Sequence, residues 1–204
     1  MGVLPANYTL AGALQFQTVN GNLDDMDLAA LKDRPDLRAA IAGVTAAQGQ
    51  HQLALADGKR NLTTTAQYTH VSASNNIGFL FSIDIPIFDR NQGEIARTAA
   101  ASVQAQDVNR QTHDQVLSDV ATAFEAVQQG AQVVKLYTSG YRQQAKQALS
   151  IRQYAYSHGA SSLLDLLDAE RTYRQTELGY RQSLATYMLA VEQLKEAVGT
   201  RSLP

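Results

Sequence analysis

The most regular pattern in the sequence is a pair of neighbouring runs in which side chains alternate with a period of two. The run from Asn61 to Val71 is rich in threonine, and in the run from Ile77 to Ile85 every odd position is large and apolar. This period places alternate side chains on opposite faces of a strand. The small polar residues from Ser72 to Asn76 are typical of a turn. The pattern predicts a β-hairpin with one continuous apolar face, made by Ile77, Phe79, Phe81, Ile83 and Ile85.

The length of the two runs indicates where this apolar face lies. Each run has about the 9 to 11 residues that a tilted membrane-spanning strand requires. An ordinary core strand can also carry such a face, but alternation over a full membrane-length arm favours a surface that contacts lipid. Two strands in lipid would leave unpaired backbone groups along both edges. The hairpin is therefore predicted to work beside other hairpins, and never as a monomer.

The second pattern is a long segment of helical character. From Gly93 to Tyr156 the chain contains no proline, and at ~1.5 Å per residue one helix of this length would be on the order of 100 Å long. Such a rod does not fit the core of a 22.1 kDa globule. Apolar and small residues step by three and four, as in a coiled coil, at Leu117, Val120, Phe124, Val127, Ala131, Val134, Thr138, Tyr141, Ala145 and Ala148. A second stripe of Val116, Ala123, Gly130 and Val133 lies beside the first, so the helix is expected to touch two neighbours.

Shorter helical patterns lie before the hairpin. Acidic residues precede a short helix that includes residues 28–32, after an irregular leader up to Asn22. A second helix is predicted from Pro35 to about Asp57, with Asp33 as its cap. Its expected seam is Leu37, Ile41, Val44, Gln48, His51 and Leu55.

A last helix follows an interruption at Gly159. The residues Ser162, Leu163, Leu164 and Asp165 have the S-x-x-D form of a helix start. The helix then runs to about Val198, with a seam at Tyr180, Leu184, Tyr187, Val191, Leu194 and Val198. The two helices that meet near Gly159 are predicted to form an antiparallel hairpin whose tip lies there.

Composition excludes several classes of protein. The net charge of −2 gives no electrostatic reason to expect nucleic acid, and the absence of cysteine removes disulfides and thiolate zinc sites. The four histidines do not have the spacing of metal ligands, so no bound metal or other cofactor is expected. No G-x-S-x-G, HExxH, P-loop or G-x-G-x-x-G motif occurs, and the chain is not expected to be an enzyme.

Three segments, in this order, resemble motifs of the TolC-type outer membrane efflux protein family. Residues 34–37, Arg-Pro-Asp-Leu, resemble the RPDL helix start of that family. Residues 85–97, Ile-Pro-Ile-Phe-Asp-Arg-Asn-Gln-Gly-Glu-Ile-Ala-Arg, resemble its corner between strand and helix, in the form common in the heavy-metal, CzcC-like branch. Residues 156–168, from Tyr156 to Asp168, are similar to its Y-x-x-G-x-x-x-x-x-D-x-L-D segment at the periplasmic tip.

The resemblance implies a mainly α fold with a two-stranded β-hairpin, that is, long antiparallel coiled-coil helices plus membrane β-barrel strands. Residues 1–33 would be a leader or linker with a short helix, residues 34–60 and 87–204 a periplasmic helical tunnel segment, and residues 61–86 a hairpin of the outer membrane barrel. The order of parts matches the second of the two structural repeats that each family member carries. We therefore expect either a piece of a longer chain or a half-length relative, which would need six copies to supply the strands of a trimer of full-length chains.

The implied function is that of an outer membrane channel in a tripartite efflux or type I secretion system. It would be a passive exit duct for substrates that an inner-membrane pump delivers, with a periplasmic adaptor coupling the two. The corner motif favours the heavy-metal class of such systems. The main alternative is a soluble periplasmic coiled-coil adaptor, which would also own a long helical hairpin. Adaptors lack the corner motif and order their parts differently.

The resemblance also assigns roles at the tip. Asp165 and Asp168 match acidic residues that form rings at the periplasmic pore entrance, whereas spacing alone favours a simple helix-cap role for them. Tyr156 matches a residue with gating contacts in relatives, or it is a partly buried hairpin contact. Ser161 stands where the best-studied member has arginine, so an identical salt bridge is not expected. Gly159 is expected to supply a backbone conformation with positive φ.

Overall fold

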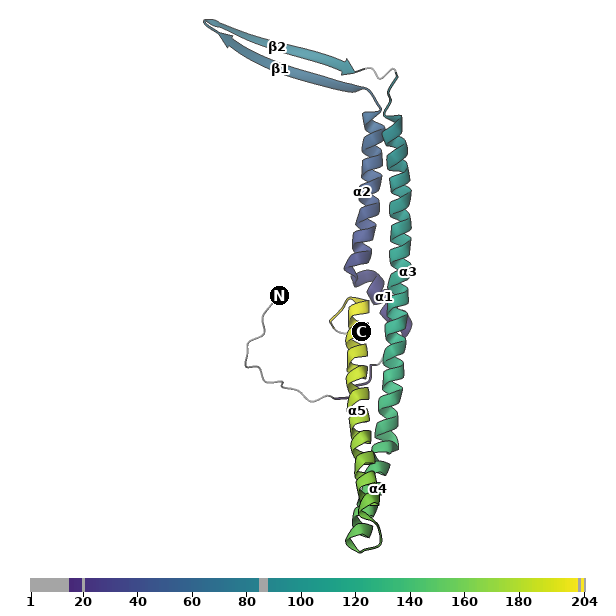
Figure 1. Ribbon diagram of the computed structural model, residues 1–204. Coiled ribbons are helices and arrows are strands. Elements are labelled where there is room, and N and C mark those ends of the chain that lie inside the picture. The colour runs from purple at the N-terminus through teal and green to yellow at the C-terminus, as the bar shows by residue number, and fades with distance from the viewer. Residues whose placement is uncertain (1–14, 20, 85–87, 202, 204) are drawn as a thin grey trace. The chain divides into compact units, whose positions relative to one another are not determined.

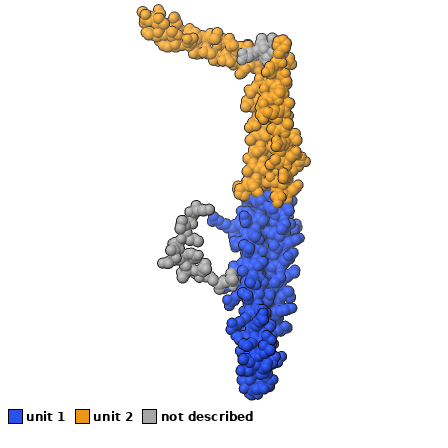
Figure 2. Space-filling model, viewed as in Figure 1, with its two compact units in different colours: residues 1–34, 116–204 blue, residues 35–115 orange. Residues whose placement is uncertain are grey.

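The fold is described from a computed structural model, which covers residues 15–19, 21–84, 88–201 and 203 (Figure 1). The chain divides into two compact units, residues 1–34 with 116–204 and residues 35–115 (Figure 2). The elements are mostly long helices, with one two-stranded antiparallel sheet. This confirms the predicted fold class, and each unit is described separately below.

The unit of residues 35–115 begins with α2, Pro35–Asp57. The predicted cap was wrong, because Asp33 is the last residue of α1, Leu23–Asp33, in the other unit. The predicted α2 seam was partly right: Leu37 is buried, and Val44, His51 and Leu55 are partly buried, but Ile41 and Gln48 are exposed. The inward positions that the prediction missed carry small residues, Ala40, Ala47 and Ala54.

The hairpin consists of β1, Asn61–Val71, and β2, Ser74–Asp84. The two strands pair in register from Asn61 opposite Asp84 to Val71 opposite Ser74. The predicted turn of residues 72–76 was too long, because only Ser72 and Ala73 form it and Ser72 has a φ of 53°. Two-residue turns with positive φ match the twist of paired strands. Residues 74–76 therefore pair with β1 and are not part of the turn.

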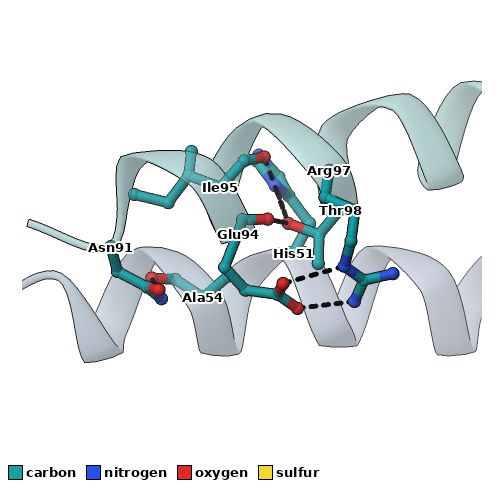
Figure 3. A network of polar contacts seen from close by, with 7 residues as sticks. All are labelled: His51, Ala54, Asn91, Glu94, Ile95, Arg97 and Thr98. Carbon is teal, nitrogen blue, oxygen red and sulfur yellow. Dashed lines mark hydrogen bonds and ion pairs between the residues drawn. The ribbon is translucent and has the colours of Figure 1, made fainter.

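Polar contacts join α2 to the start of α3, Gln92–Leu136 (Figure 3). His51 Nδ1 lies 3.1 Å from the hydroxyl of Thr98, which also donates to the carbonyl of Glu94 at 2.8 Å. The side chain of Asn91 donates to the carbonyl of Ala54 at 3.0 Å. Since Thr98 is buried, these bonds satisfy polar groups that the helix contact removes from water.

The unit of residues 1–34 and 116–204 has an apolar core between helices. It contains α1, the second part of α3, a wide helical turn at Tyr137–Tyr141, α4 (Arg142–Ser157) and α5 (Leu163–Val198). The α5 seam was predicted with the correct phase. Its buried side chains come from α1, α3 and α5, and they are Met26, Ala30, Val116, Val120, Val127, Val134, Leu184, Tyr187, Ala190, Leu194 and Val198.

Two side chains hold other segments against α5. The hydroxyl of Tyr187 donates to the carbonyl of Gln17 at 2.6 Å, and the ring of Phe16 lies 5.0 Å from the ring of Tyr187. The guanidinium of Arg34 donates to Asp119 at 3.0 Å and to the carbonyl of Ala197 at 3.2 Å. Arg34 thus satisfies a carbonyl at the C-terminal end of α5, where intrahelical donors run out.

The rod predicted from Gly93 to Tyr156 is not one continuous α-helix. The wide turn at Tyr137–Tyr141 separates α3 from α4. The predicted inward positions Thr138, Tyr141 and Ala148 are therefore wrong, because all three are exposed. Arg142 and Leu149 lie at partly buried positions instead.

Candidate functional site

The first candidate site is the connection between α4 and α5. The α4 helix ends when Gly159 adopts a left-handed conformation with φ 74°. The amide of Gly159 then donates to the carbonyl of Tyr156 at 3.0 Å, and the amide of Ala160 donates to the carbonyl of Ala155 at 2.8 Å. These two bonds define a Schellman motif, in which glycine is favoured because it has no Cβ. The expected positive φ of Gly159 is confirmed.

The α5 helix begins with a capping box. The amide of Asp165 donates to the hydroxyl of Ser162 at 3.2 Å, and the amide of Ser162 donates to Oδ2 of Asp165 at 3.1 Å. The S-x-x-D pattern therefore predicted this helix start correctly. Ser161, which is partly exposed, also donates its hydroxyl to Oδ2 of Asp165, at 3.1 Å.

These bonds change the acidity of Asp165. The side-chain and backbone hydrogen bonds from Ser162, and then the hydroxyl of Ser161, lower the pKa of this carboxyl below its ordinary value. Each donor stabilises the charged form more than the neutral one. Asp165 is therefore a fixed negative charge at the turn, whatever further role it has.

The remaining predicted tip residues, Asp168 and Tyr156, lie in the two helices that flank the Gly159 turn. Asp168 is exposed three residues after Asp165, a spacing that places the two side chains on one side of the helix. Tyr156 lies in the last turn of α4 and is also exposed. The structure brings Ser161, Ser162 and Asp165 into contact, and it leaves Asp168 and Tyr156 facing outward.

The second candidate site is the apolar face of the hairpin. The register places Phe79 and Phe81 opposite Ala66 and Thr64. Phe79 is 71% exposed and Phe81 is 70% exposed. The predicted lipid-facing residues Ile77 and Ile83 lie on the same face, and Ile85 lies outside the described residues. The partner strand adds Leu62 and Tyr68, so the apolar face spans both strands.

The opposite face of the hairpin is mostly polar. It carries the pairs Thr63 with Ser82, Gln67 with Gly78 and Thr69 with Asn76, together with Leu80. Near the turn, the apolar face also becomes polar: the Tyr68 hydroxyl donates to Asn75 Oδ1 at 2.9 Å, and the ring of His70 contacts the same oxygen. Each strand therefore separates an apolar face from a polar one, and the apolar face ends at Tyr68.

One cluster was missed from the sequence. Arg142 donates two hydrogen bonds to Glu177, at 2.8 and 3.0 Å, and its guanidinium carbon lies 4.2 Å from the centre of the Tyr180 ring. The hydrogen bonds from Arg142 lower the pKa of Glu177, and the same pair raises the pKa of Arg142. The signal was available: Arg142 and Glu177 are nearly equally far in sequence from Gly159, so an antiparallel hairpin places them opposite each other.

Two kinds of feature are absent from the described residues. In that part of the chain, no three histidine, aspartate or glutamate side chains lie together in a way that could hold a metal ion. Within the same ranges, no helix combines the length and the hydropathy needed to cross a membrane.

A hairpin with one apolar and one polar face, joined to long antiparallel helices, defines the TolC-like class of outer membrane channel folds. The family model described as outer membrane efflux protein matches residues 29–200. The chain belongs to this family. Membership places it in the cell outer membrane, with its helical part in the periplasm.

Individual relatives agree with this assignment. The cobalt-zinc-cadmium resistance protein CzcC of Cupriavidus metallidurans is 27% identical over 198 residues, which cover 86% of this chain and 45% of CzcC. The open-state MtrE outer membrane channel of Neisseria gonorrhoeae has a TM-score of 0.77 at 25% identity, covering 85% of this chain and 41% of MtrE. The outer membrane protein VceC of Vibrio cholerae has a TM-score of 0.74 at 22% identity, covering 90% of this chain and 46% of VceC. The chain thus spans slightly less than half the length of these relatives.

Proposed function

We propose that this chain forms part of the wall of an outer membrane efflux channel. In this proposal residues 61–86 contribute to a β-barrel, and residues 34–60 and 87–204 contribute to a periplasmic helical tunnel. The channel is a passive exit duct: an inner-membrane pump supplies the energy and a periplasmic adaptor couples the two. The main observation in support is the two-faced hairpin, whose apolar face suits lipid and whose polar face suits a water-filled lumen.

The edges of the hairpin support an oligomeric wall. The described strands form a sheet of two, so each strand has one edge that does not pair within the chain. In hydrocarbon each unsatisfied backbone group costs several kcal/mol, so the barrel has to close with other hairpins. Closure can come from six half-length copies, or from three chains that each supply two hairpins.

The acidic turn supports a selective entrance. Asp165 and Asp168 are both exposed beside the Gly159 turn, and the lowered pKa of Asp165 keeps it charged. Repeated around a symmetric pore, these carboxylates would concentrate negative potential and favour cations. Divalent metal ions are a fitting cargo, in keeping with the name of the CzcC relative. They would pass through the pore as substrate.

Conductance of the complete assembly in planar bilayers tests this proposal. We expect Asp165→Ala combined with Asp168→Ala to raise conductance or to lower cation selectivity. Asp168→Asn is the cleaner single change, because Asp168 is not part of the capping box. Glu125→Gln, which removes another exposed carboxylate from α3, is the matched control and should leave selectivity unchanged.

The possible outcomes separate the two parts of the proposal. Unchanged current-voltage curves for the double variant would leave Asp165 with its capping role only and Asp168 with a favourable position near the helix N-terminus. A wild-type chain that is recovered from cells in the soluble fraction without detergent would favour the adaptor alternative and reject the channel itself.

A further inference from the structure

The wide turn at Tyr137–Tyr141 interrupts the longest helical segment of the chain. The amide of Arg142 bonds to the carbonyl of Tyr137, five residues back, and this spacing defines a π-helical turn. Within the turn Gly140 has extended backbone angles, φ 179° and ψ −36°. The hydroxyls of Thr138 and Ser139 donate to carbonyls of the preceding turn at 3.1 to 3.2 Å. The turn is therefore a defined structure with its own hydrogen bonds.

The turn shifts the phase of the helix by one residue. Before it, the buried side chains Val116, Val120, Val127 and Val134 follow a heptad pattern. Continued without a break, that pattern would turn Tyr141, Gln144 and Ala148 inward, but all three are exposed. The partly buried positions are Arg142, Ala145 and Leu149 instead. One extra residue is thus accommodated in the wide turn.

The facing helix is also weakened at this level. A Cβ added to Gly179 would lie 2.6 Å from the hydroxyl oxygen of Tyr137, so Gly179 lies directly against the wide turn. Glycine destabilises a helix relative to alanine, because it loses more backbone freedom on folding. The extended residue Gly140 in one helix and Gly179 in the other therefore lie in the same part of the hairpin, and both helices are easier to bend there.

Packing differs on the two sides of this level. On the α1 side, Val134 and Leu194 are fully buried. On the tip side, the described residues of α4 include no buried side chain, and the part of α5 before Gly179 has none either. The main specific contact at the boundary is the arginine clamp, which we define as Arg142, Glu177 and Tyr180.

We propose that the Tyr137–Tyr141 turn and Gly179 form a hinge, and that the arginine clamp holds the tip in one orientation. The tip here means α4, the Gly159 turn and the part of α5 before Gly179. Bending at the hinge would move Asp165 and Asp168 relative to the pore axis without unfolding either helix. This gating role rests on the proposed channel function, whereas the hinge itself does not.

Distances between spin labels test the hinge without reference to conduction. Because the chain has no cysteine, Glu125→Cys on α3 and Ser157→Cys at the end of α4 give one defined pair within one unit. Labelled chain would be diluted with unlabelled chain in detergent. We expect a narrow distance distribution for the parent and a broader or shifted one for Arg142→Gln. Arg152→Gln, which removes an exposed charge from the same helix, should match the parent.

Two further measurements sharpen the test. Loss of the clamp should speed amide hydrogen exchange in residues 138–142 by about tenfold, because a charge-assisted pair no longer opposes local opening. Deletion of Gly140 removes the extra residue of the wide turn, so that the inward positions of α3 and α4 follow one heptad pattern. This change should narrow the distribution of spin-label distances and slow amide hydrogen exchange in the turn. Gly179→Ala should broaden the distribution through its clash with Tyr137, and Tyr137→Phe should partly reverse that effect.

The outcomes distinguish the hinge from the channel. Parent-like distances and exchange for Arg142→Gln would overturn the hinge, even if the assembly conducts ions. Altered distances in an assembly that shows no conductance would keep the hinge and reject the proposed function.

Discussion

The β-hairpin exposes its apolar side chains, whereas the helical pair α3 and α5 buries them. In the hairpin, Phe79 and Phe81 are exposed over most of their surface. In the helical pair, Val120, Val134 and Leu194 have no exposed surface. The helices find apolar partners within the same chain, whereas the hairpin face finds none among the described residues. In the proposed channel the hairpin would therefore gain its stability from lipid and neighbouring strands, whereas the helical pair supplies much of its own.

The physical origin of the difference is geometric. A helix concentrates its apolar residues in a stripe, and two stripes from one chain can cover each other. A strand presents a flat face, and two strands side by side extend that face without covering it. Substitutions in the two regions should therefore affect different measurements.

The largest effect on folding is expected from Leu194→Ala. This side chain is fully buried in the α5 seam, and replacing a buried leucine by alanine typically costs about 2–5 kcal/mol. Urea unfolding in detergent, followed by far-UV circular dichroism, would measure the loss. Insertion into the membrane should change much less than the free energy of unfolding.

The matched control is Leu189→Ala on the same helix, where the leucine is 60% exposed. Its expected cost is within about 0.5 kcal/mol. Equal losses for the two variants would mean that the seam of α5 is not the core of this unit.

The largest effect on membrane insertion is expected from Phe81→Arg. An arginine on a lipid-facing strand costs about 2–4 kcal/mol near the bilayer midplane. The fraction of chain that resists extraction from outer membranes should fall. Ser82→Arg, at the neighbouring position on the opposite face, is the control and should be tolerated if that face lines a lumen. Insertion that is unchanged by Phe81→Arg would argue against lipid contact at this face.

The sequence predicted the type and position of most elements because their periods are clear. The strand pattern of residues 61–71 and the helix ending near Val198 are both confirmed. The remaining inward positions of α2 were harder to predict, because Ile41 looks more apolar than Ala40 or Ala47, although the alanines face inward. Close helix packing favours small residues, and a pattern based on hydrophobicity alone does not reveal that preference. Similarly, Asn75 and Asn76 have turn-like chemistry, but they pair across the hairpin.

The candidate site was partly predictable for the same reason. The capping box at Ser162 and Asp165 depends on residues three apart, so the sequence contains all of it. The arginine clamp depends on which face of α4 turns toward α5, and the wide turn at Tyr137–Tyr141 shifts that face by one residue from the pattern of α3. Thr138, Ser139 and Gly140 are weak helix formers and mark a place where a helix can kink, but such residues also occur in ordinary helices and do not specify a π-helical turn.

The smallest change in stability is expected at the Gly159 turn. This turn is exposed, as the hairpin is, but its polar groups are hydrogen-bonded within the chain. Ser162→Ala removes the hydroxyl that caps α5, at a cost of about 1 kcal/mol. It also removes the largest cause of the lowered pKa of Asp165, so that pKa should rise toward its ordinary value. Ser157→Ala, which removes an exposed hydroxyl from α4, is the control.

The pH dependence of this cap has a definite sign. A carboxyl whose pKa is lowered in the folded state stabilises the fold above its ordinary pKa, and that contribution is lost as the pH falls through the lowered value. The difference in helix stability between parent and Ser162→Ala should therefore be largest near neutral pH. It should shrink in acid to the part due to the hydroxyl alone, because Asp165 is then protonated in both proteins. Circular dichroism across this pH range would check the trend, and a difference that grows in acid would contradict the assigned role of Asp165. Such a result would mean that Asp165, like the apolar face of the hairpin, interacts mainly with groups outside the chain.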